Sequence, residues 1–94
     1  MLAKIFTFLK EKNILNIVKN GLTKVLLKNE DKIKNEINEI LDEDAPKAKD
    51  KLITFIFNNI ELPFPVNLFK GTIKKTINKN FDKIVNHIKE KINN

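Results

Sequence analysis

The sequence contains no arginine, serine, cysteine, glutamine, tyrosine or tryptophan, and its one histidine is His87. Without cysteine there is no disulfide, no cysteine-based zinc site and no thiol nucleophile, and without serine there is no serine nucleophile. A single histidine also excludes any site built on two of them. The sequence therefore predicts a non-catalytic protein, with no catalytic residues, no metal ligands and no cofactor.

The chain has only two glycines, three prolines and no long apolar run. So few turn-forming residues argue against a sheet of many strands. The apolar clusters around residues 5–9 and 52–57 are too short to span a bilayer. The first residues lack the small-residue cleavage site of a signal peptide. We therefore expect a cytoplasmic protein, with peripheral attachment to a membrane or leaderless secretion as the alternatives.

Lysine supplies all 18 basic residues, and these outnumber the 12 acidic ones to give a formal net charge of +6. Lysine, asparagine and isoleucine together make up about half of the chain, as an A/T-rich coding sequence would produce. The number of lysines alone is therefore weak evidence of function. Hydrophobic residues account for 41% of the chain, which is enough for one modest core and predicts a single domain over residues 1–94.

The most informative pattern is an internal repeat between residues 16–41 and 67–92. At an offset of 51 residues, 11 of the 26 aligned positions are identical. Chance in so biased a composition gives roughly 3 identities. Further upstream the offset becomes 47, and residues 4–8 match residues 51–55. The sequence thus predicts an internal duplication, with repeat 1 at about 2–43, repeat 2 at about 46–93 and a linker at about 61–65.

Apolar residues recur every three or four positions through the second part of each repeat, which is the spacing of an amphipathic helix. In repeat 2 this spacing continues from Val66 to Ile92, and Pro65 suits the first turn. In repeat 1 the same pattern has a gap at Asn29, a residue type that caps helices. We favour one helix in each repeat, over about 14–42 and 65–93, with Asn29 as the place for a kink or a break.

The shorter apolar segments, at about 2–11 and 46–60, predict two further helices. Asp44 and Pro46 are a typical start for the second one, because a carboxylate can cap a helix and proline fits its first turn. Two prolines in the linker then end that helix, since the residue before a proline favours extended geometry. The predicted fold is all-α: a four-helix bundle built from two tandem helical hairpins in the order short-long-short-long.

Five lysines of repeat 2 are candidates for binding lipid head groups or phosphate. On one continuous helix, Lys75, Lys79 and Lys83 form a stripe opposite the apolar face, and Lys70 and Lys74 lie near its border. Such a stripe can bind an anionic membrane or a nucleic-acid backbone. An ordinary solvated helix face is the alternative. The absence of arginine and of interleaved aromatic residues makes nucleic acid the less favoured partner.

Five of the seven phenylalanines lie in repeat 2 and are candidates for a protein interface: Phe55, Phe57, Phe64, Phe69 and Phe81. Packing in the core is the alternative for most of them. Phe64 lies between two prolines, so we expect it to project from a stiff link. Apolar side chains that stay exposed mark a dimer interface or an edge that inserts into a membrane.

Two other polar features are weaker candidates. The five acidic residues between Asn35 and Pro46 lack the alternating oxygen ligands and the glycine of a calcium loop, so a local role at helix ends is favoured. His87 has Glu90 three residues further on, which permits a hydrogen bond but forms neither a catalytic pair nor a metal site.

The leading interpretation is a small, non-catalytic helical interaction module that self-associates or binds a protein partner through apolar helix faces. In size, charge and helical character, the chain also resembles the small cationic, cysteine-free helical bacteriocins with a saposin-like bundle. The second alternative is accordingly a protein that binds an anionic membrane surface, in which the lysine stripe of Lys75, Lys79 and Lys83 contacts the lipid and Phe64 or Phe57 acts as a wedge. Non-specific nucleic-acid binding is the third alternative.

Overall fold

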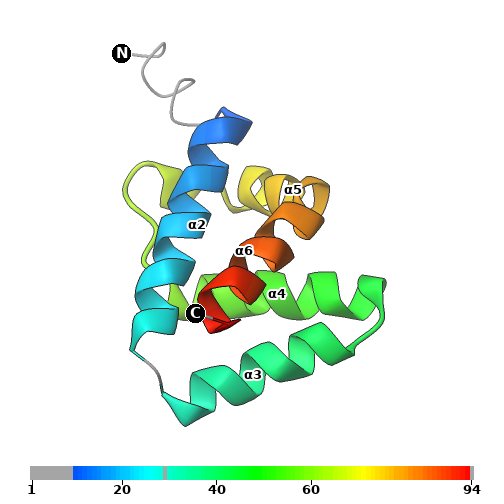
Figure 1. Ribbon diagram of the computed structural model, residues 1–94. Helices are drawn as coiled ribbons and strands as arrows, with labels where there is room; N and C mark the ends of the chain where they lie inside the picture. The colour runs from blue at the N-terminus through cyan, green and yellow to red at the C-terminus, as the bar shows by residue number, and fades with distance from the viewer. Residues whose placement is uncertain (1–9, 29, 94) are drawn as a thin grey trace.

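The computed structural model describes residues 10–28 and 30–93, and nearly all of them are helical (Figure 1). The described residues contain no strand, which confirms the all-α prediction. The predicted count of four helices is wrong, because this part of the chain forms five α-helices and one short 3-10 helix. These elements are α2 (Glu11–Leu27), α3 (Asp31–Asp42), α4 (Ala45–Asn59), η1 (Val66–Leu68), α5 (Lys70–Lys79) and α6 (Phe81–Asn93).

Of the two predicted short helices, the structure tests only the second fully. Most of the first, at about 2–11, lies outside the described residues, and Glu11 belongs to α2. The second, at about 46–60, corresponds to α4. Pro46 lies in the first turn of α4, where the sequence placed it. Asp44 is the N-cap residue and has an extended backbone, but its side chain forms no capping hydrogen bond.

Both predicted long helices are broken in two, so the preference for single helices over 14–42 and 65–93 is corrected. The first break lies between Leu27 and Asp31, and the second lies at Asn80. The side chain of Asn80 stabilises the second break, because its Nδ2 donates to the Thr76 carbonyl oxygen at 2.9 Å and to Glu11 Oε1 at 3.0 Å. Asparagine is suited to this role since its amide competes with the backbone for hydrogen bonds.

The helices pack across the two halves of the sequence, so the predicted pair of tandem hairpins is not formed. α3 lies against α4, and α2 lies against α5 and α6. Figure 1 shows α3 and α4 one above the other, with α2 crossing beside them. Each half of the chain therefore buries much of its apolar surface against the other half. The side chains with no exposed surface are aliphatic: Val18, Leu22, Ile37, Leu52, Ile56, Ile73, Ile77, Ile84 and Ile88.

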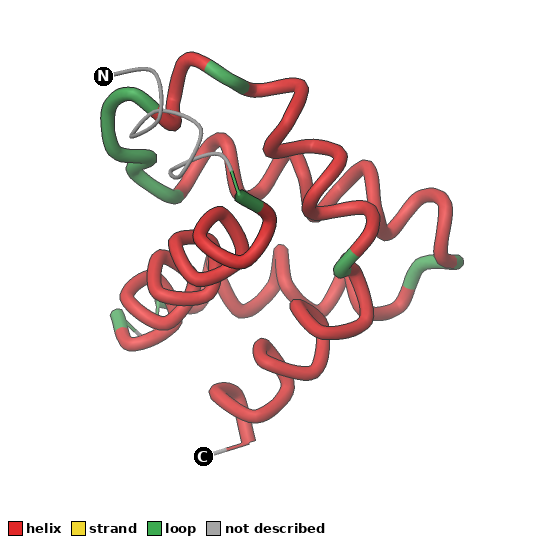
Figure 2. Tube along the Cα trace, turned by 90° about the horizontal axis from the view of Figure 1, so that it is seen from above, coloured by secondary structure: helices red, strands yellow, loops and turns green. Residues whose placement is uncertain are grey.

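A close approach at Gly21 brings the end of α4 to α2. A Cβ atom on Gly21 would overlap Cγ2 of Ile60, so the backbone of α2 lies directly against that side chain. The chain then leaves α4 and forms an arc at the edge of the molecule before it reaches η1 (Figure 2). In this way a glycine in α2 positions the connection between α4 and α5 alongside α2.

The described residues also include no helix that is both long enough and apolar enough to cross a membrane.

Candidate binding groove

A groove of about 770 Å³ lies between α2 and the connection that follows α4. We call it the α2 groove. Ile17, Lys24 and Lys28 line it from α2, and Leu62, Pro63 and Phe64 line it from the connection. Its volume falls within the roughly 300–1,000 Å³ that is typical of ligand pockets.

The local sequence explains both walls of the α2 groove. Residues 17, 21, 24 and 28 share one face of α2 because they are spaced by three or four positions. Gly21 interrupts the side chains on this face and lets Ile60 approach. On the other wall, Pro63 and Pro65 keep the chain out of helical geometry. The connection therefore runs beside α2 as an irregular segment and leaves a space between them.

One strongly exposed apolar side chain, Phe64, lies in the lining of the α2 groove. Four large apolar side chains are exposed among the described residues, and three of them belong to the segments that form the groove. Phe64 lines the groove and is 77% exposed, Leu27 precedes the lining residue Lys28 and is 76% exposed, and Leu68 is 64% exposed in η1. The fourth, Ile92, lies in α6. An exposed aromatic side chain on a concave surface is a candidate anchor for a binding partner.

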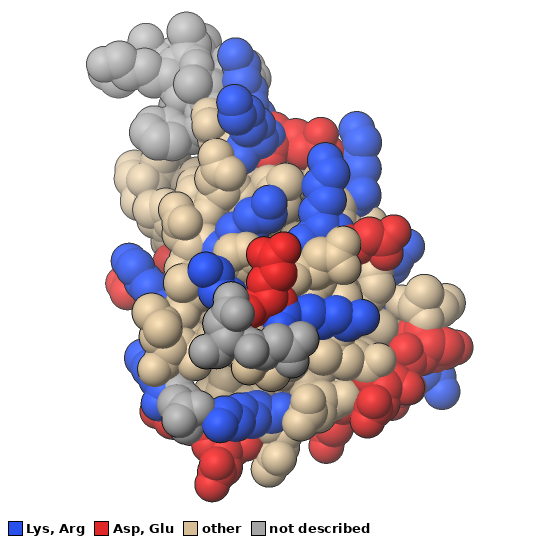
Figure 3. All heavy atoms as spheres, in the orientation of Figure 1, with Lys and Arg blue, Asp and Glu red and all other residues tan. Residues whose placement is uncertain are grey.

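The charges at the α2 groove are mostly positive. Lys24 and Lys28 line it one helical turn apart, and Glu61 is the one acidic lining residue. Within residues 10–28 and 30–93, the ion pairs are Lys51–Glu43 and Lys79–Glu11, so neither groove lysine is paired. On the face seen in Figure 3, acidic side chains gather at the lower right, over the end of α3 and the start of α4, while lysines predominate above.

The five lysines singled out from the sequence are exposed but lie on two helices. Lys70, Lys74, Lys75 and Lys79 belong to α5, and Lys83 belongs to α6 beyond the break at Asn80. The stripe expected on one continuous helix is therefore interrupted.

Two of these lysines have partners on other helices. Lys79 Nζ lies 3.5 Å from Glu11 Oε1, and Lys70 Nζ lies 5.9 Å from the centre of the Phe57 ring. These contacts give Lys70 and Lys79 local structural roles at the surface.

The five phenylalanines singled out from the sequence have different environments. Phe55 is buried in the core. Phe57, Phe69 and Phe81 are half-buried, and Phe81 packs against the core with Lys49 Nζ 5.8 Å from its ring centre. Phe64 is the one member of the set that is fully exposed. The structure does not bring the five together as one surface.

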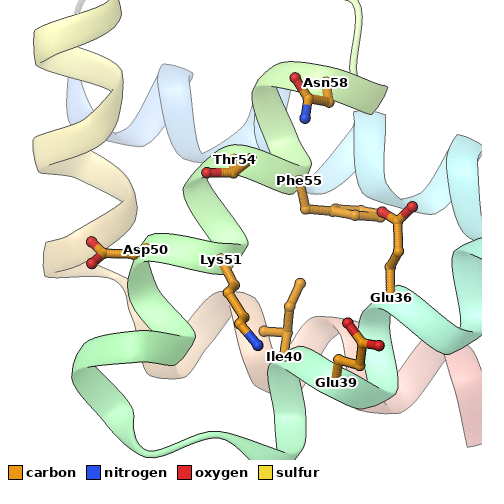
Figure 4. A pocket seen from close by; sticks show the side chains of 8 residues that line it. All are labelled: Glu36, Glu39, Ile40, Asp50, Lys51, Thr54, Phe55 and Asn58. Carbon is orange, nitrogen blue, oxygen red and sulfur yellow. The ribbon is translucent and has the colours of Figure 1, made fainter.

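A second cavity, of about 310 Å³, lies between α3 and α4. Figure 4 shows Glu36 and Glu39 projecting from α3 toward α4, while Asp50 points away from them. Phe55 forms an apolar part of the lining. Among the described residues, no group of three histidine, cysteine or acidic side chains is placed to hold a metal ion. The acidic cavity therefore lacks the ligand set of a metal centre.

An exposed ion pair ties the α3–α4 connection to α4. Lys51 Nζ donates to Glu43 Oε1 at 2.7 Å. This hydrogen bond, together with the positive charge of Lys51, lowers the pKa of the Glu43 carboxyl below its ordinary value. The same hydrogen bond raises the pKa of Lys51. Lys51 lines the acidic cavity, but its ion pair with Glu43 includes neither Glu36 nor Glu39.

His87 connects α6 to α2 in place of the hydrogen bond to Glu90 that the sequence permits. Its Nε2 atom lies 2.9 Å from Thr23 Oγ1 and 3.1 Å from the carbonyl oxygen of Lys19. The Thr23 hydroxyl donates to that same carbonyl at 3.0 Å. An unprotonated Nε2 would direct its lone pair at the carbonyl oxygen, so the contact with Lys19 favours the tautomer that carries its proton on Nε2. His87 is thereby part of the packing between two helices.

The comparisons with known proteins add no relative: no protein-family model, curated protein or solved structure matches the chain. The α2 groove must therefore be interpreted from its own residues. Sequence reasoning found Phe64 but missed Leu27, Leu68 and the two lysines of the groove. The exposure of Leu27 could have been predicted, because Leu27 lies off the buried helix face that Val18, Leu22 and Val25 define.

Proposed function

We propose that this protein is a non-catalytic interaction module that binds a protein partner in the α2 groove. The observation that carries the proposal is Phe64, which is 77% exposed on the wall of one concave surface, while Leu27 and Leu68 are exposed in α2 and η1, which also contribute lining residues. Holding such side chains in water is unfavourable, and covering them contributes about 25 cal/mol for each Å² of apolar area removed from water, from which the cost of association is subtracted. The lack of serine, cysteine and a second histidine supports a role without catalysis.

A selection of binders from a random peptide library tests this function. Peptides selected on the wild-type protein are measured against the variant Leu27→Ser/Phe64→Ser and against the control Ile92→Ser, which alters an exposed apolar residue of α6. We expect the double variant to lose about tenfold or more in affinity, because aromatic anchors dominate binding energy, and the control to keep it. The proposal would be overturned if the library yields no binder, or if the selected peptides bind the double variant as tightly as the wild-type protein.

The membrane-surface and nucleic-acid alternatives have less support. The break at Asn80 separates Lys83 from Lys75 and Lys79, and the Phe57 ring lies half-buried near Lys70. The lysines and aromatic side chains that those functions require are therefore dispersed over α4, α5 and α6.

We also propose that the chain is one domain produced by internal duplication, in which α2 and α3 correspond to α5 and α6. Its support is the position of the two helix breaks, since the offset of 51 residues brings Asn29 onto Asn80. Because the halves pack into one another, urea should unfold the chain in a single transition, seen alike by circular dichroism and by methyl NMR signals. Two separate transitions would contradict the single domain.

A further inference from the structure

The α2 groove favours one class of occupant. We infer that it binds an acidic amphipathic helix of a partner protein, with apolar residues in the groove and carboxylates facing Lys24 and Lys28. The inference rests on the proposed function and adds the secondary structure and the charge of the partner. Three features of the groove carry it: its length, the apolar residues Ile17, Leu62 and Phe64 in its lining, and its unpaired positive charge.

The length of the groove matches a short helix. Its α2 wall runs from Ile17 to Lys28. At 1.5 Å per residue this wall is about 16 Å long, which corresponds to roughly three turns of a partner helix. Helices that dock into grooves insert apolar residues at i, i+3 or i+4, and i+7, and three turns provide these positions.

Other peptide-binding modes fit the groove poorly. The described residues offer no sheet edge to which an extended peptide could add a strand. A proline-rich segment needs a groove lined by several aromatic rings, whereas Phe64 is the one aromatic residue in the part of the lining that the structure describes. The same shortage of rings, together with the absence of arginine from the chain, disfavours single-stranded nucleic acid.

The charge of the groove defines the sign of the partner. Lys24 and Lys28 lie on one face of α2, with their Cβ atoms roughly 5–6 Å apart. Residues 10–28 contain five lysines and a single acidic residue, Glu11, so the surrounding field is also positive. Glutamates one turn apart on a partner helix would pair with both groove lysines. Glu61, on the opposite wall, would repel an acidic chain there and so fixes its carboxylates on the α2 side.

A second copy of this chain supplies no such helix from its described part. The helix with the most acidic exposed surface is α3, and its apolar residues Ile33, Ile37 and Ile40 are already buried within its own molecule. A polar helix face alone cannot cover the apolar lining residues Ile17, Leu62 and Phe64. Residues 1–9 contain no acidic residue. The acidic occupant is therefore a segment of another protein.

Three designed peptides of about 12 residues test the inference, each with leucines at i, i+3 and i+7. The other positions carry mostly glutamate in the first peptide, glutamine in the second and lysine in the third. Each also carries one tryptophan, whose fluorescence reports binding without background because the protein has neither tryptophan nor tyrosine. Binding is measured as a function of salt, and ¹⁵N NMR shifts identify the residues that each peptide contacts.

We expect the glutamate peptide to shift the signals of Ile17, Lys24 and Phe64 and to bind at least about tenfold more tightly than the lysine peptide, with an affinity that falls as salt rises. The variant Lys24→Glu/Lys28→Glu should reverse this order. Lys74→Glu/Lys75→Glu, the control on α5 with the same change of charge, should leave it unchanged.

The remaining outcomes separate the two proposals. If all three peptides bind the groove equally, the acidic partner is wrong while the groove remains a protein-binding site. If no peptide shifts the groove signals, both proposals fail. An oligothymidylate that shifts the groove signals more strongly than the glutamate peptide would overturn the inference in favour of nucleic acid. Vesicles of anionic lipid that do so would overturn it in favour of a membrane surface.

Discussion

Gly21 and Ile60 are in direct contact, with no room for a side chain between the backbone of α2 and the isoleucine. Cγ1 and Cβ of Ile60 lie 3.2 Å and 3.3 Å from the place that a Cβ on residue 21 would occupy, and Cγ2 lies closer still. Both residues line the α2 groove. The contact therefore determines the distance between the two walls of the groove.

Replacing this glycine by alanine should destabilise the protein and disturb the groove. Overpacking of this kind costs about 1–3 kcal/mol, which exceeds the helix propensity that alanine gains. Gly71→Ala is the matched control, because a Cβ there meets no atom within 4 Å, and it should leave stability unchanged or raise it by about 0.4–1 kcal/mol. Urea denaturation measures both variants.

The structural cause is tested by a double-mutant cycle with Ile60→Ala, which removes the overlapping methyl group. The double variant Gly21→Ala/Ile60→Ala should be more stable than the sum of the two single changes predicts. Additive effects, or equal stability of Gly21→Ala and Gly71→Ala, would show that the contact does not constrain α2.

Asn80 should contribute more to the stability of the protein than is usual for a residue between two helices. Asn80→Ala removes the hydrogen bonds to Thr76 and Glu11 from a side chain that is 7% exposed. We expect a loss of about 0.5–1.5 kcal/mol for each bond removed, measured by urea denaturation. Glu11→Ala should cost less, because that carboxylate is partly exposed and water replaces its partner. A larger loss for Glu11→Ala than for Asn80→Ala would contradict this explanation of the break.

The hydrophobic pattern predicted helices and the buried residues along them, but could not show where a helix ends. Ile73, Ile77, Ile84 and Ile88 keep helical spacing across Asn80, so the apolar face continues although the helix stops. One of the two side-chain hydrogen bonds at the break joins Asn80 to Glu11, which is 69 residues away in the sequence. A contact between residues so far apart in the sequence cannot be predicted from the residues on either side of the break.

The candidate site was predictable only in part. Phe64 was identified because two prolines isolate it from the helices on either side. Its neighbours in the groove come from α2, and the pairing of α2 with residues 59–67 depends on the close approach at Gly21. The alignment of the two repeats did not predict that approach, because an offset of 51 residues places Thr72 opposite Gly21. Tertiary packing between the two halves therefore determined the site.

The contact of His87 with Thr23 predicts a specific tautomer. Because the Thr23 hydroxyl and Nε2 both face the carbonyl oxygen of Lys19, the neutral imidazole should carry its proton on Nε2. Long-range ¹H–¹⁵N NMR spectra of the ring distinguish the two tautomers. Thr23→Val, which keeps the shape and removes the hydroxyl, should lower stability by about 0.5–1.5 kcal/mol. A proton found on Nδ1 would refute the hydrogen-bond assignment.

The Glu43–Lys51 ion pair should produce two opposite pH dependences. The pKa of Glu43 is lowered in the folded protein, so its contribution to stability is present at neutral pH and is lost as the pH falls through that folded value. The pKa of Lys51 is raised, so its contribution is present at neutral pH and is lost as the pH rises through its own folded value. Both changes should be small because the pair is exposed at the surface.

Lys51→Met should return the pKa of Glu43 toward its ordinary value, because it removes the hydrogen bond and the nearest positive charge together. Lys47→Met is the matched control, since Lys47 lowers the pKa of Glu43 through its charge alone and by less. A ¹³C NMR titration of the Glu43 carboxyl group measures both shifts. Equal shifts in the two variants would mean that the general positive charge around Glu43, and not the 2.7 Å hydrogen bond, controls its ionisation.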